Sequence, residues 1–195
     1  MSVDFVFGGA RSGKSRFAER LAAAAAGGNA ARVLYIATAQ ASDGEMAARI
    51  ERHRRDRPSG WRTREEPLDV AGCLAACAAE PVVLIDCLSL LLNNWMFQDV
   101  PALGQETLDR DILAAAERVC EQRSRALVEA LAAHPGRVVC VSNEAGQGIV
   151  PADPRTRLYR DWLGWLNQAV AGVAERVYWV AAGVGVDLRR LEARL

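Results

Sequence analysis

The stretch Gly8-Gly9-Ala10-Arg11-Ser12-Gly13-Lys14-Ser15 decides the fold, because it matches the phosphate-binding loop pattern G-x-x-x-x-G-K-[ST] at every defined position. In this pattern the glycines let backbone N–H groups turn inward to bind phosphate oxygens, and the following helix adds the positive end of its dipole. Lys14 is expected to reach the β- and γ-phosphates, and the Ser15 hydroxyl is expected to bind Mg²⁺. We therefore interpret Gly8–Ser15 as the binding site of a nucleoside triphosphate.

The residues around this loop support that interpretation. Lys14 is the only lysine among 24 basic residues, and the rest are arginine. A phosphate-binding loop needs a compact ammonium group on a flexible stem, which arginine does not supply. The apolar stretch Val3–Phe7 before the loop indicates a buried strand, and a helix is predicted from Ser12 or Gly13 to Ala26. Strand, loop and helix in this order are the context that the motif requires.

A magnesium ion at such a loop is usually held by an acidic residue as well, placed at the end of an apolar strand. Asp86 ends the stretch VVLID, so Ser15 and Asp86 are the predicted metal ligands. An Asp at a strand-to-helix turn is also a common structural residue, which is the alternative interpretation. Glu144, which follows the stretch VVCVSN, is a second candidate for facing the nucleotide.

Apolar strands alternate with helices along the chain. Strands are predicted at 3–7, 32–37, 82–86, 137–142 and 176–180, with an extended segment at 63–67. Helices are predicted at 13–26, 43–54, 68–79, 88–97, 105–133 and 155–173, and Ser42 with Glu45 forms a capping-box pattern at the second. Strands that are apolar throughout indicate a mostly parallel sheet with helices on both faces. The expected fold class is α/β, with one P-loop domain spanning residues 1–195.

The composition excludes several functional classes. Apolar residues make up 51% and charged residues 25% of the chain, as in a folded globular protein. Because 24 acidic residues balance 24 basic ones, nucleic acid and anionic membranes are not expected partners. The sequence shows neither an apolar run of roughly 18 residues nor a signal peptide, so no membrane span and a cytoplasmic location are expected. The five cysteines lack zinc-site spacing and are expected to be buried, reduced thiols.

His53 is the candidate for covalent chemistry. Glu45, Arg49 and His53 are spaced by four residues, so they share one face of the predicted helix. Histidine is easily neutral and nucleophilic near pH 7. A surface histidine within a solvated run of arginines is the alternative interpretation. The other histidine, His134, is interpreted as a structural cation at a helix end.

Segments of the chain resemble, in the same order, the family of bifunctional adenosylcobinamide kinases and adenosylcobinamide-phosphate guanylyltransferases of cobalamin biosynthesis. The resemblance covers about Val3 to Leu188 and is carried by GGARSGKSRFAE, LYIATAQ, DGEMAARIERHRRDRP, WRTREEP, VVLIDCLSLLLNN, VSNEAGQGIVP and RDWLGWLNQAVAGVAERVYWVAAG. The R-I-x-x-H-x-x-x-R-P and N-E-x-G-x-G-I-V-P segments are far more specific than the phosphate-binding loop.

The resemblance implies a RecA-like core, a homotrimer and two reactions. ATP or GTP phosphorylates the hydroxyl of adenosylcobinamide; GTP then donates GMP to that phosphate through a GMP–histidine intermediate, giving adenosylcobinamide-GDP and pyrophosphate. Carried over by position, His53 is the nucleophile and Gly8–Ser15 bind the phosphates. The remaining implied nucleotide-site residues are Thr38, Ala39, Gln40, Arg54, Arg55, Asp56, Arg57, Glu65 and Asp86. Only a neutral imidazole can attack the α-phosphate, so GMP transfer is expected to fail in acid.

Three functions stay open at this point. The first is the bifunctional enzyme, and the second is a plain small-molecule kinase in which His53 only binds substrate. The third is a nucleotide-gated binding protein, which would carry an extra domain or a guanine-reading N-K-x-D loop; the sequence has neither. The residues do not decide between ATP and GTP as phosphoryl donor, and they do not identify the corrinoid site. The helix bearing Tyr159, Trp162 and Trp165 has three possible orientations, toward the corrinoid, toward a neighbouring subunit or toward the core, and the core is the one expected.

Overall fold

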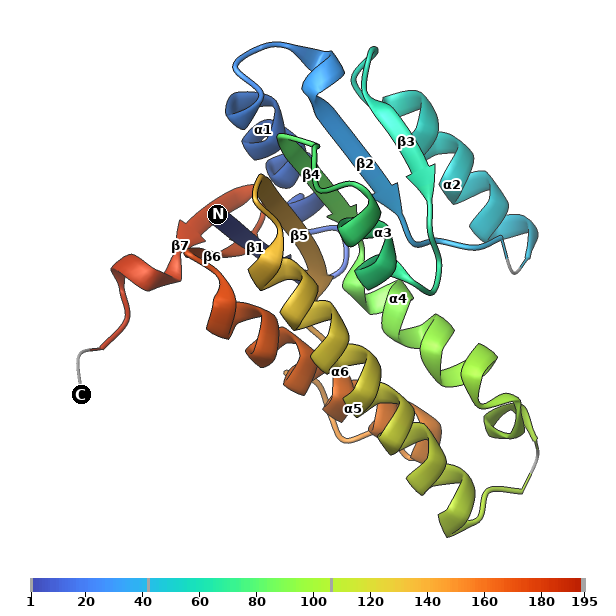
Figure 1. Ribbon diagram of the computed structural model, residues 1–195. Coiled ribbons are helices and arrows are strands. Elements are labelled where there is room, and N and C mark those ends of the chain that lie inside the picture. Colours follow the sequence, from blue (N-terminus) through green and yellow to red (C-terminus); the bar gives the residue numbers. More distant parts are fainter. Residues whose placement is uncertain (1, 42, 106, 194–195) are drawn as a thin grey trace.

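The computed structural model describes residues 2–41, 43–105 and 107–193, and it contains one seven-stranded sheet in the order β3-β2-β4-β5-β1-β6-β7. All pairings are parallel except that of β7 with β6. The strands are β1 (Ser2–Gly8), β2 (Val33–Ala37), β3 (Arg62–Glu65), β4 (Val82–Asp86), β5 (Arg137–Asn143), β6 (Arg176–Ala181) and β7 (Val184–Asp187). The predicted mostly parallel α/β fold is therefore confirmed, and Figure 1 shows the helices around the twisted sheet.

The helices alternate with the strands as predicted. They are α1 (Lys14–Ala25), α2 (Gly44–Asp56), α3 (Val70–Ala76), α4 (Leu88–Asn94), α5 (Arg110–Ala133) and α6 (Pro154–Val173). A π-helical turn (Trp95–Asp99) and short 3₁₀ turns at Ala30–Arg32, Pro101–Gly104 and Leu188–Arg190 complete the chain. None of the helices in the described ranges is long and apolar enough to cross a membrane.

Three helix starts differ from the prediction because other residues cap them. Helix α5 begins at Arg110, where the Asp109 side chain accepts a hydrogen bond from the Ile112 amide at 2.8 Å. Asp69 caps α3 in the same way. At α2 the observed cap is Asp43, and Ser42, which the predicted capping box uses, lies outside the described residues. A short polar side chain that satisfies free amides fixes each start.

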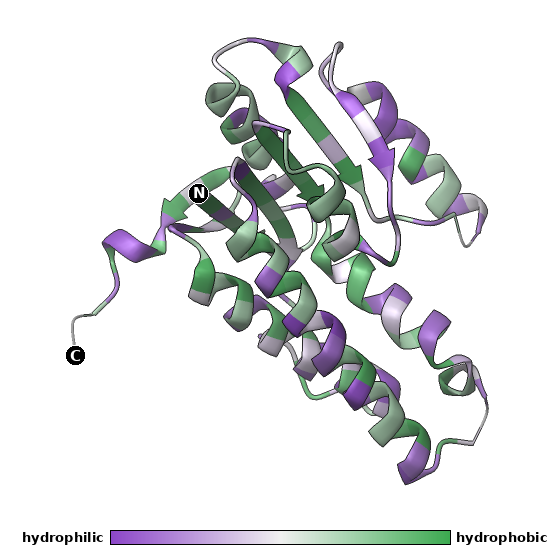
Figure 2. Ribbon diagram, in the orientation of Figure 1, coloured by the Kyte–Doolittle hydropathy of each residue, from purple (hydrophilic) through white to green (hydrophobic). Residues whose placement is uncertain are grey.

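Two clusters of apolar side chains cover the two faces of the sheet. The larger packs against α3, α4, α5 and α6, and the smaller packs against α1. Successive residues of a strand point to opposite faces, so Phe5 belongs to the larger cluster and Val6 to the smaller. Four cysteines are buried and Cys77 is half-buried, all with free thiols, as predicted. Figure 2 shows the interior strands as hydrophobic and the edge strand β3 as mostly hydrophilic.

Two predictions about individual side chains are wrong. The Nδ1 atom of the buried His134 accepts a hydrogen bond from the Gly136 amide at 3.1 Å, so its proton is on Nε2, 3.2 Å from the Cys77 carbonyl. His134 is thus structural, but as a neutral imidazole and not as a cation. On α6, Trp162 is half-buried against the core, whereas Trp165 is 52% exposed.

The carboxyl ends of the parallel strands meet at one edge of the sheet. The pairing register places Gly8 beside Asn143 and Ala37 beside Asp86. In open α/β sheets this edge is where ligands bind. A ligand site is therefore expected between the loops that leave β1, β2, β4 and β5.

Candidate active site

The glycine loop leaves β1 and wraps around the start of α1. Gly13 has a φ of +91° and caps the helix. A Cβ atom on Gly8 would lie 2.2 Å from the carbonyl oxygen of Val180, so only glycine fits between β1 and β6 there. The Lys14 ammonium donates a hydrogen bond to the Gly9 carbonyl at 3.1 Å and thus lies across the loop. The loop thus has the backbone curl expected of a phosphate-binding loop.

A first cavity opens between this loop, α2 and the carboxyl ends of β2, β4 and β5. Its polar and charged lining residues are Lys14, Ser15, Tyr35, Arg49, His53, Arg54, Arg57, Glu65, Asp86 and Asn143. Ala37, Ala39, Met46, Ile50, Cys87 and Leu90 complete the lining. Basic groups therefore surround a partly apolar pocket, an arrangement that suits a nucleotide with its base and its phosphates.

A second cavity lies between the glycine loop and α2. It is lined by Ala10, Arg11, Ser12, Gly13, Lys14, Ser15, Arg16, Glu45, Ala48, Arg49, Arg52 and His53. Lys14, Ser15, Arg49 and His53 line both cavities. The shared face of α2 predicted from the four-residue spacing thus borders the glycine loop, and the imidazole of His53 lies where both cavities can be reached.

Asp86 ends β4 and is held by a neighbouring strand. Its Oδ2 accepts a hydrogen bond from the Tyr35 hydroxyl at 2.8 Å. Burial raises the pKa of Tyr35, and the Asp86 charge raises it further, so the hydroxyl stays protonated and donating. The Arg57 guanidinium carbon lies 3.8 Å from the centroid of the Tyr35 ring, within cation–π distance. Tyr35 therefore positions both a carboxylate and a cation of the first cavity.

Lys14 is half-buried beside these groups. Burial lowers the pKa of its ammonium from the ordinary value, and Arg49 acts in the same direction, while Cys87 and Asp86 oppose them. An anionic ligand would favour the charged form still more strongly. Lys14 is thus placed to respond to phosphate with a change in its proton affinity.

Ser15 and Asp86 fit the predicted magnesium site in their chemistry. Both line the first cavity, and hydroxyl and carboxylate oxygens are ligands that Mg²⁺ accepts. In residues 2–41, 43–105 and 107–193 no group of three or more His, Cys, Asp or Glu side chains could hold a metal. Mg²⁺ at a nucleotide site needs only one or two protein groups, since phosphates and water complete its coordination.

The structure does not bring every residue implied by the resemblance to the cavities. The hydroxyl of the buried Thr38 donates to the Cys87 carbonyl at 2.7 Å and accepts from the Cys87 amide at 2.8 Å. Gln40 is exposed and pairs with the Gln98 side chain. Ala39 is the member of this tripeptide that lines the first cavity.

Of the predicted residues on and after α2, some line the first cavity and others do not. Arg54 and Arg57 line the first cavity, and Arg54 forms an ion pair with Glu65, another lining residue. Arg55 is exposed and lines neither cavity, and the side chain of Asp56 lies outside the described part of the structure. Gly8 and Gly9 shape the loop without lining a cavity.

Sequence reasoning missed Tyr35 and Asn143. Asn143, the last residue of β5, donates to the Ser89 hydroxyl at 3.0 Å and lines the first cavity. The candidate Glu144 lines neither cavity; its amide donates to the Gly8 carbonyl at 3.1 Å and its side chain accepts from the Gly146 amide. A polar side chain inside or ending an apolar strand is the signal that could have identified both residues.

Comparisons with known proteins point to one family. The model of a family described as cobinamide kinase / cobinamide phosphate guanyltransferase matches residues 4–188. The bifunctional adenosylcobalamin biosynthesis protein CobP of Pseudomonas aeruginosa is 46% identical over 187 residues, which cover 95% of this chain and 96% of that protein. The CobU proteins of Salmonella typhimurium and Escherichia coli, bifunctional by name as well, are 42% and 40% identical and are each covered to 98% by alignments spanning 94% of this chain.

Proposed function

Because the chain belongs to the family of cobinamide kinases and cobinamide phosphate guanyltransferases, we propose that both reactions use the nucleotide-binding edge formed by the glycine loop and α2. The protein is an enzyme of adenosylcobalamin biosynthesis that phosphorylates cobinamide and transfers a guanylyl group to the phosphate. The observation that carries the proposal is the set of four residues shared by the two cavities, which include Lys14 and His53.

In the kinase reaction, the glycine loop and Lys14 hold the β- and γ-phosphates of ATP or GTP. Phosphoryl transfer needs little covalent chemistry from the protein, so positioning and charge neutralisation are its main contributions. A Mg²⁺ ion held by Ser15 and Asp86 would neutralise charge on the phosphates when bound. The acceptor hydroxyl of adenosylcobinamide then forms a bond to the γ-phosphorus and releases its proton to solvent, while the bond to the bridging oxygen breaks and the nucleoside diphosphate leaves.

In the guanylyltransferase reaction, His53 attacks the α-phosphorus of GTP. A ring nitrogen forms the N–P bond while the bond to the bridging oxygen breaks, and pyrophosphate leaves. A phosphate oxygen of adenosylcobinamide phosphate then attacks the same phosphorus and releases the imidazole, giving adenosylcobinamide-GDP. Arg49 and Lys14, which line both cavities with His53, are placed to stabilise the negative charge that grows on the phosphates.

The test is to label the protein with GTP carrying ³²P in the α-phosphate, in the presence of Mg²⁺ and without corrinoid. We expect wild-type protein to retain an acid-labile, base-stable label after denaturation, and His53→Ala to retain none. Labelling of the wild type should be slower at pH 5 than at pH 8, because a protonated imidazole is not a nucleophile. Ala47→Ser, an exposed change on the same helix that lines neither cavity, serves as the control.

The same variants separate the bifunctional enzyme from a plain kinase. Kinase activity of His53→Ala is expected to persist in part, because that reaction requires no covalent histidine. Equal loss of both activities in a folded His53→Ala protein would contradict separate roles, and unlabelled wild-type protein would favour a plain kinase.

We also propose a homotrimer in the cytoplasm. The exposed Trp165 borders a groove between α5 and α6 that also includes Val128, Trp162 and Leu166, and aromatic groups of this kind are common in interfaces. The five free thiols support a reducing compartment. Sedimentation equilibrium measures the mass directly, and a monomer of 21.1 kDa at micromolar concentration would contradict the trimer.

A further inference from the structure

The segment Asn143–Pro151, NEAGQGIVP, has no assigned task in either reaction, although it is one of the most specific stretches of the sequence. It connects β5 to α6, and all its residues from 145 to 150 are exposed. Ile149 is 95% exposed and Val150 is 63% exposed. Two adjacent aliphatic side chains so open to water indicate a surface that binds something.

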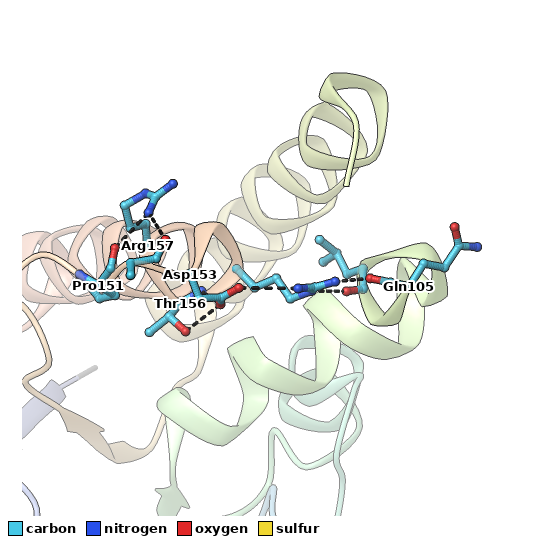
Figure 3. A network of polar contacts seen from close by, with 8 residues as sticks. Gln105, Pro151, Asp153, Thr156 and Arg157 are labelled. Atoms are coloured by element: carbon cyan, nitrogen blue, oxygen red, sulfur yellow. Dashed lines mark hydrogen bonds and ion pairs between the residues drawn. The ribbon is translucent and has the colours of Figure 1, made fainter. Parts of the chain in front are cut away.

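The two ends of this segment are fixed. At the start, the Glu144 amide donates to the Gly8 carbonyl at 3.1 Å, and the Asn167 side chain donates to the Asn143 carbonyl at 2.9 Å. At the far end, Arg157 donates to the Pro151 carbonyl at 2.8 Å and to the carbonyl of the next residue. Figure 3 shows this end of the network. Hydrogen bonds therefore fix both ends of the segment that presents Ile149 and Val150 to solvent.

The start of α6 adds a second set of anchors. Asp153 caps the helix at the Thr156 amide, 2.8 Å away, and its other carboxylate oxygen contacts Arg155 at 3.4 Å. The Arg155 guanidinium reaches the Leu103 carbonyl at 2.6 Å and also donates to the carbonyl of Gln105 (Figure 3). These arginines are occupied by backbone oxygens within the protein and hold the loop in place.

The chemistry of the segment differs from that of the nucleotide cavities. Residues 145–151 (AGQGIVP) carry no charge, whereas both cavities are lined by arginines and Lys14. Residues 145–151 therefore offer no positive charge that could bind a triphosphate. The start of the segment nevertheless lies at the nucleotide-binding edge, because Asn143 lines the first cavity and Glu144 is bonded to Gly8. The position suits a second reactant that must approach the phosphates.

We propose that the tip formed by Gln147, Ile149 and Val150 binds the corrin macrocycle of the acceptor substrate. This inference rests on the proposed function and names the acceptor side of the same site. A corrin ring carries methyl groups and carboxamide arms on its periphery. The two aliphatic side chains match the methyl groups, and the Gln147 amide can exchange hydrogen bonds with the carboxamides. The macrocycle and the triphosphate thus meet at one edge from two chemically different surfaces.

The test compares the double variant Ile149→Ser/Val150→Ser with wild type and with Leu191→Ser, which changes a 69% exposed leucine near the C-terminus. Binding of adenosylcobinamide is measured by equilibrium dialysis, and KM is measured for the corrinoid and for GTP. We expect the double variant to bind the corrinoid at least tenfold more weakly. Its KM for GTP and its GMP labelling without corrinoid should match wild type, and Leu191→Ser should match wild type throughout.

Corrinoid affinity within twofold of wild type would overturn the inference, and so would equal increases in both KM values. A lower mass of the double variant in sedimentation would also overturn it, because the tip would then bind a second copy of the chain. Absence of GMP labelling in the wild type would contradict the histidine intermediate alone, since the dialysis measurement decides on the loop by itself.

Discussion

Tyr35 connects two charged groups of the nucleotide site through one side chain. Its hydroxyl holds Asp86 at 2.8 Å, and its ring supports the guanidinium of Arg57 at 3.8 Å from the centroid. Another nitrogen of Arg57 donates to the Thr63 hydroxyl at 3.1 Å, but the buried Nε atom has no hydrogen-bond partner among the residues that the structure describes, so this N–H is available to a ligand. A residue buried in an interior strand thus sets the position of two charged groups that line the first cavity.

Tyr35→Phe removes the hydroxyl and keeps the ring. Hydrogen bonds to charged groups contribute about 1.5–3 kcal/mol, so we expect the Mg²⁺ concentration for half-maximal activity to rise by roughly tenfold or more. The measurement is activity against Mg²⁺ concentration at saturating nucleotide. Tyr178→Phe, a buried tyrosine on β6 that lines neither cavity, is the control. An unchanged Mg²⁺ dependence of Tyr35→Phe would contradict a positioning role for the hydroxyl.

Sequence reasoning identifies single residues where a motif fixes their spacing. Lys14, Ser15 and His53 are found this way, and the structure brings them together around two cavities. Tyr35 was missed because an aromatic residue in an apolar strand is normally part of the core. Asn143 was missed because the adjacent Glu144 is the acidic residue after the strand, which is the residue type expected to face a nucleotide and its metal. Which of two adjacent residues faces a cavity depends on the strand's pairing register, which one sequence does not reveal.

Among the elements, the turn between β6 and β7 supports the glycine loop. Gly183 has a φ of +80°, and its amide donates to the Ser12 carbonyl at 2.8 Å. A Cβ on Gly13 would lie 3.0 Å from the Gly183 Cα, so the two backbones are in close contact. Strand β7 was missed because it has only four residues, includes a glycine and lies at the antiparallel edge. The turn that leads into the unpredicted strand β7 therefore packs against the glycine loop, which the sequence predicts from its motif.

Gly183→Val tests this support. A branched side chain at this φ strains the backbone by roughly 1–2 kcal/mol, and relief of the strain should move the amide away from Ser12. Gly28→Val is a matched control, because Gly28 has the same φ of +80° and lies beyond the end of α1. We expect both variants to lose similar stability in thermal unfolding, while Gly183→Val alone raises KM for GTP. Equal KM values for the two variants would argue against the support.

Helix α2 carries His53 but contributes little to the core. None of its residues is fully buried in the part of the chain that the structure describes, and the helix begins at a cap formed by Asp43. Its alternating charges predict a solvated helix, which is what the structure has. This charge pattern does not show whether the helix faces a ligand, because a solvated run of arginines and a phosphate-facing run have the same composition. Only the position of α2 beside the glycine loop separates the two interpretations.

At the scale of the whole molecule, Asp4 and Arg137 join the neighbouring strands β1 and β5. Asp4 is 1% exposed, and its two carboxylate oxygens accept from Arg137 at 2.7 and 3.0 Å. This hydrogen bonding raises the pKa of Arg137. The glycine loop follows β1, and β5 ends at Asn143. The ion pair therefore links, near the amino ends of both strands, the two strands whose carboxyl ends border the candidate site.

Arg137→Met leaves the Asp4 carboxylate buried without its partner. Removing one member of a buried ion pair costs about 3–5 kcal/mol, so we expect the free energy of unfolding to fall by that amount. Adding Asp4→Asn should restore part of the loss, since the unpaired charge is then gone. Arg125→Met removes the exposed pair with Glu121 and should cost less than about 1 kcal/mol. Urea unfolding measures all of these, and equal losses for Arg137→Met and Arg125→Met would contradict the argument.

The sequence predicts the class of fold, but it does not predict the order of the strands in the sheet. Alternation of apolar strands with helices predicts a parallel sheet, and five of the strands lie close to the predicted ranges. The order β3-β2-β4-β5-β1-β6-β7 depends on pairings between segments that are far apart in the sequence. Ser2 pairs with Arg137, 135 residues away, and Asp4 pairs with Arg176, 172 residues away. Those pairings are set by how the two apolar clusters fill space, which local patterns do not encode.

Lys14, the only lysine of the chain, lies half-buried between the two cavities. Reagents that acylate amines therefore meet only two kinds of target in this protein, the α-amino group and an ammonium inside the active site. Coupling through amines to a sensor surface or a dye would consume this lysine, whereas maleimide or carboxylate chemistry would spare it. With a nucleotide bound at the glycine loop as proposed, Lys14 would be covered, and the extent of lysine acylation would report directly on nucleotide binding.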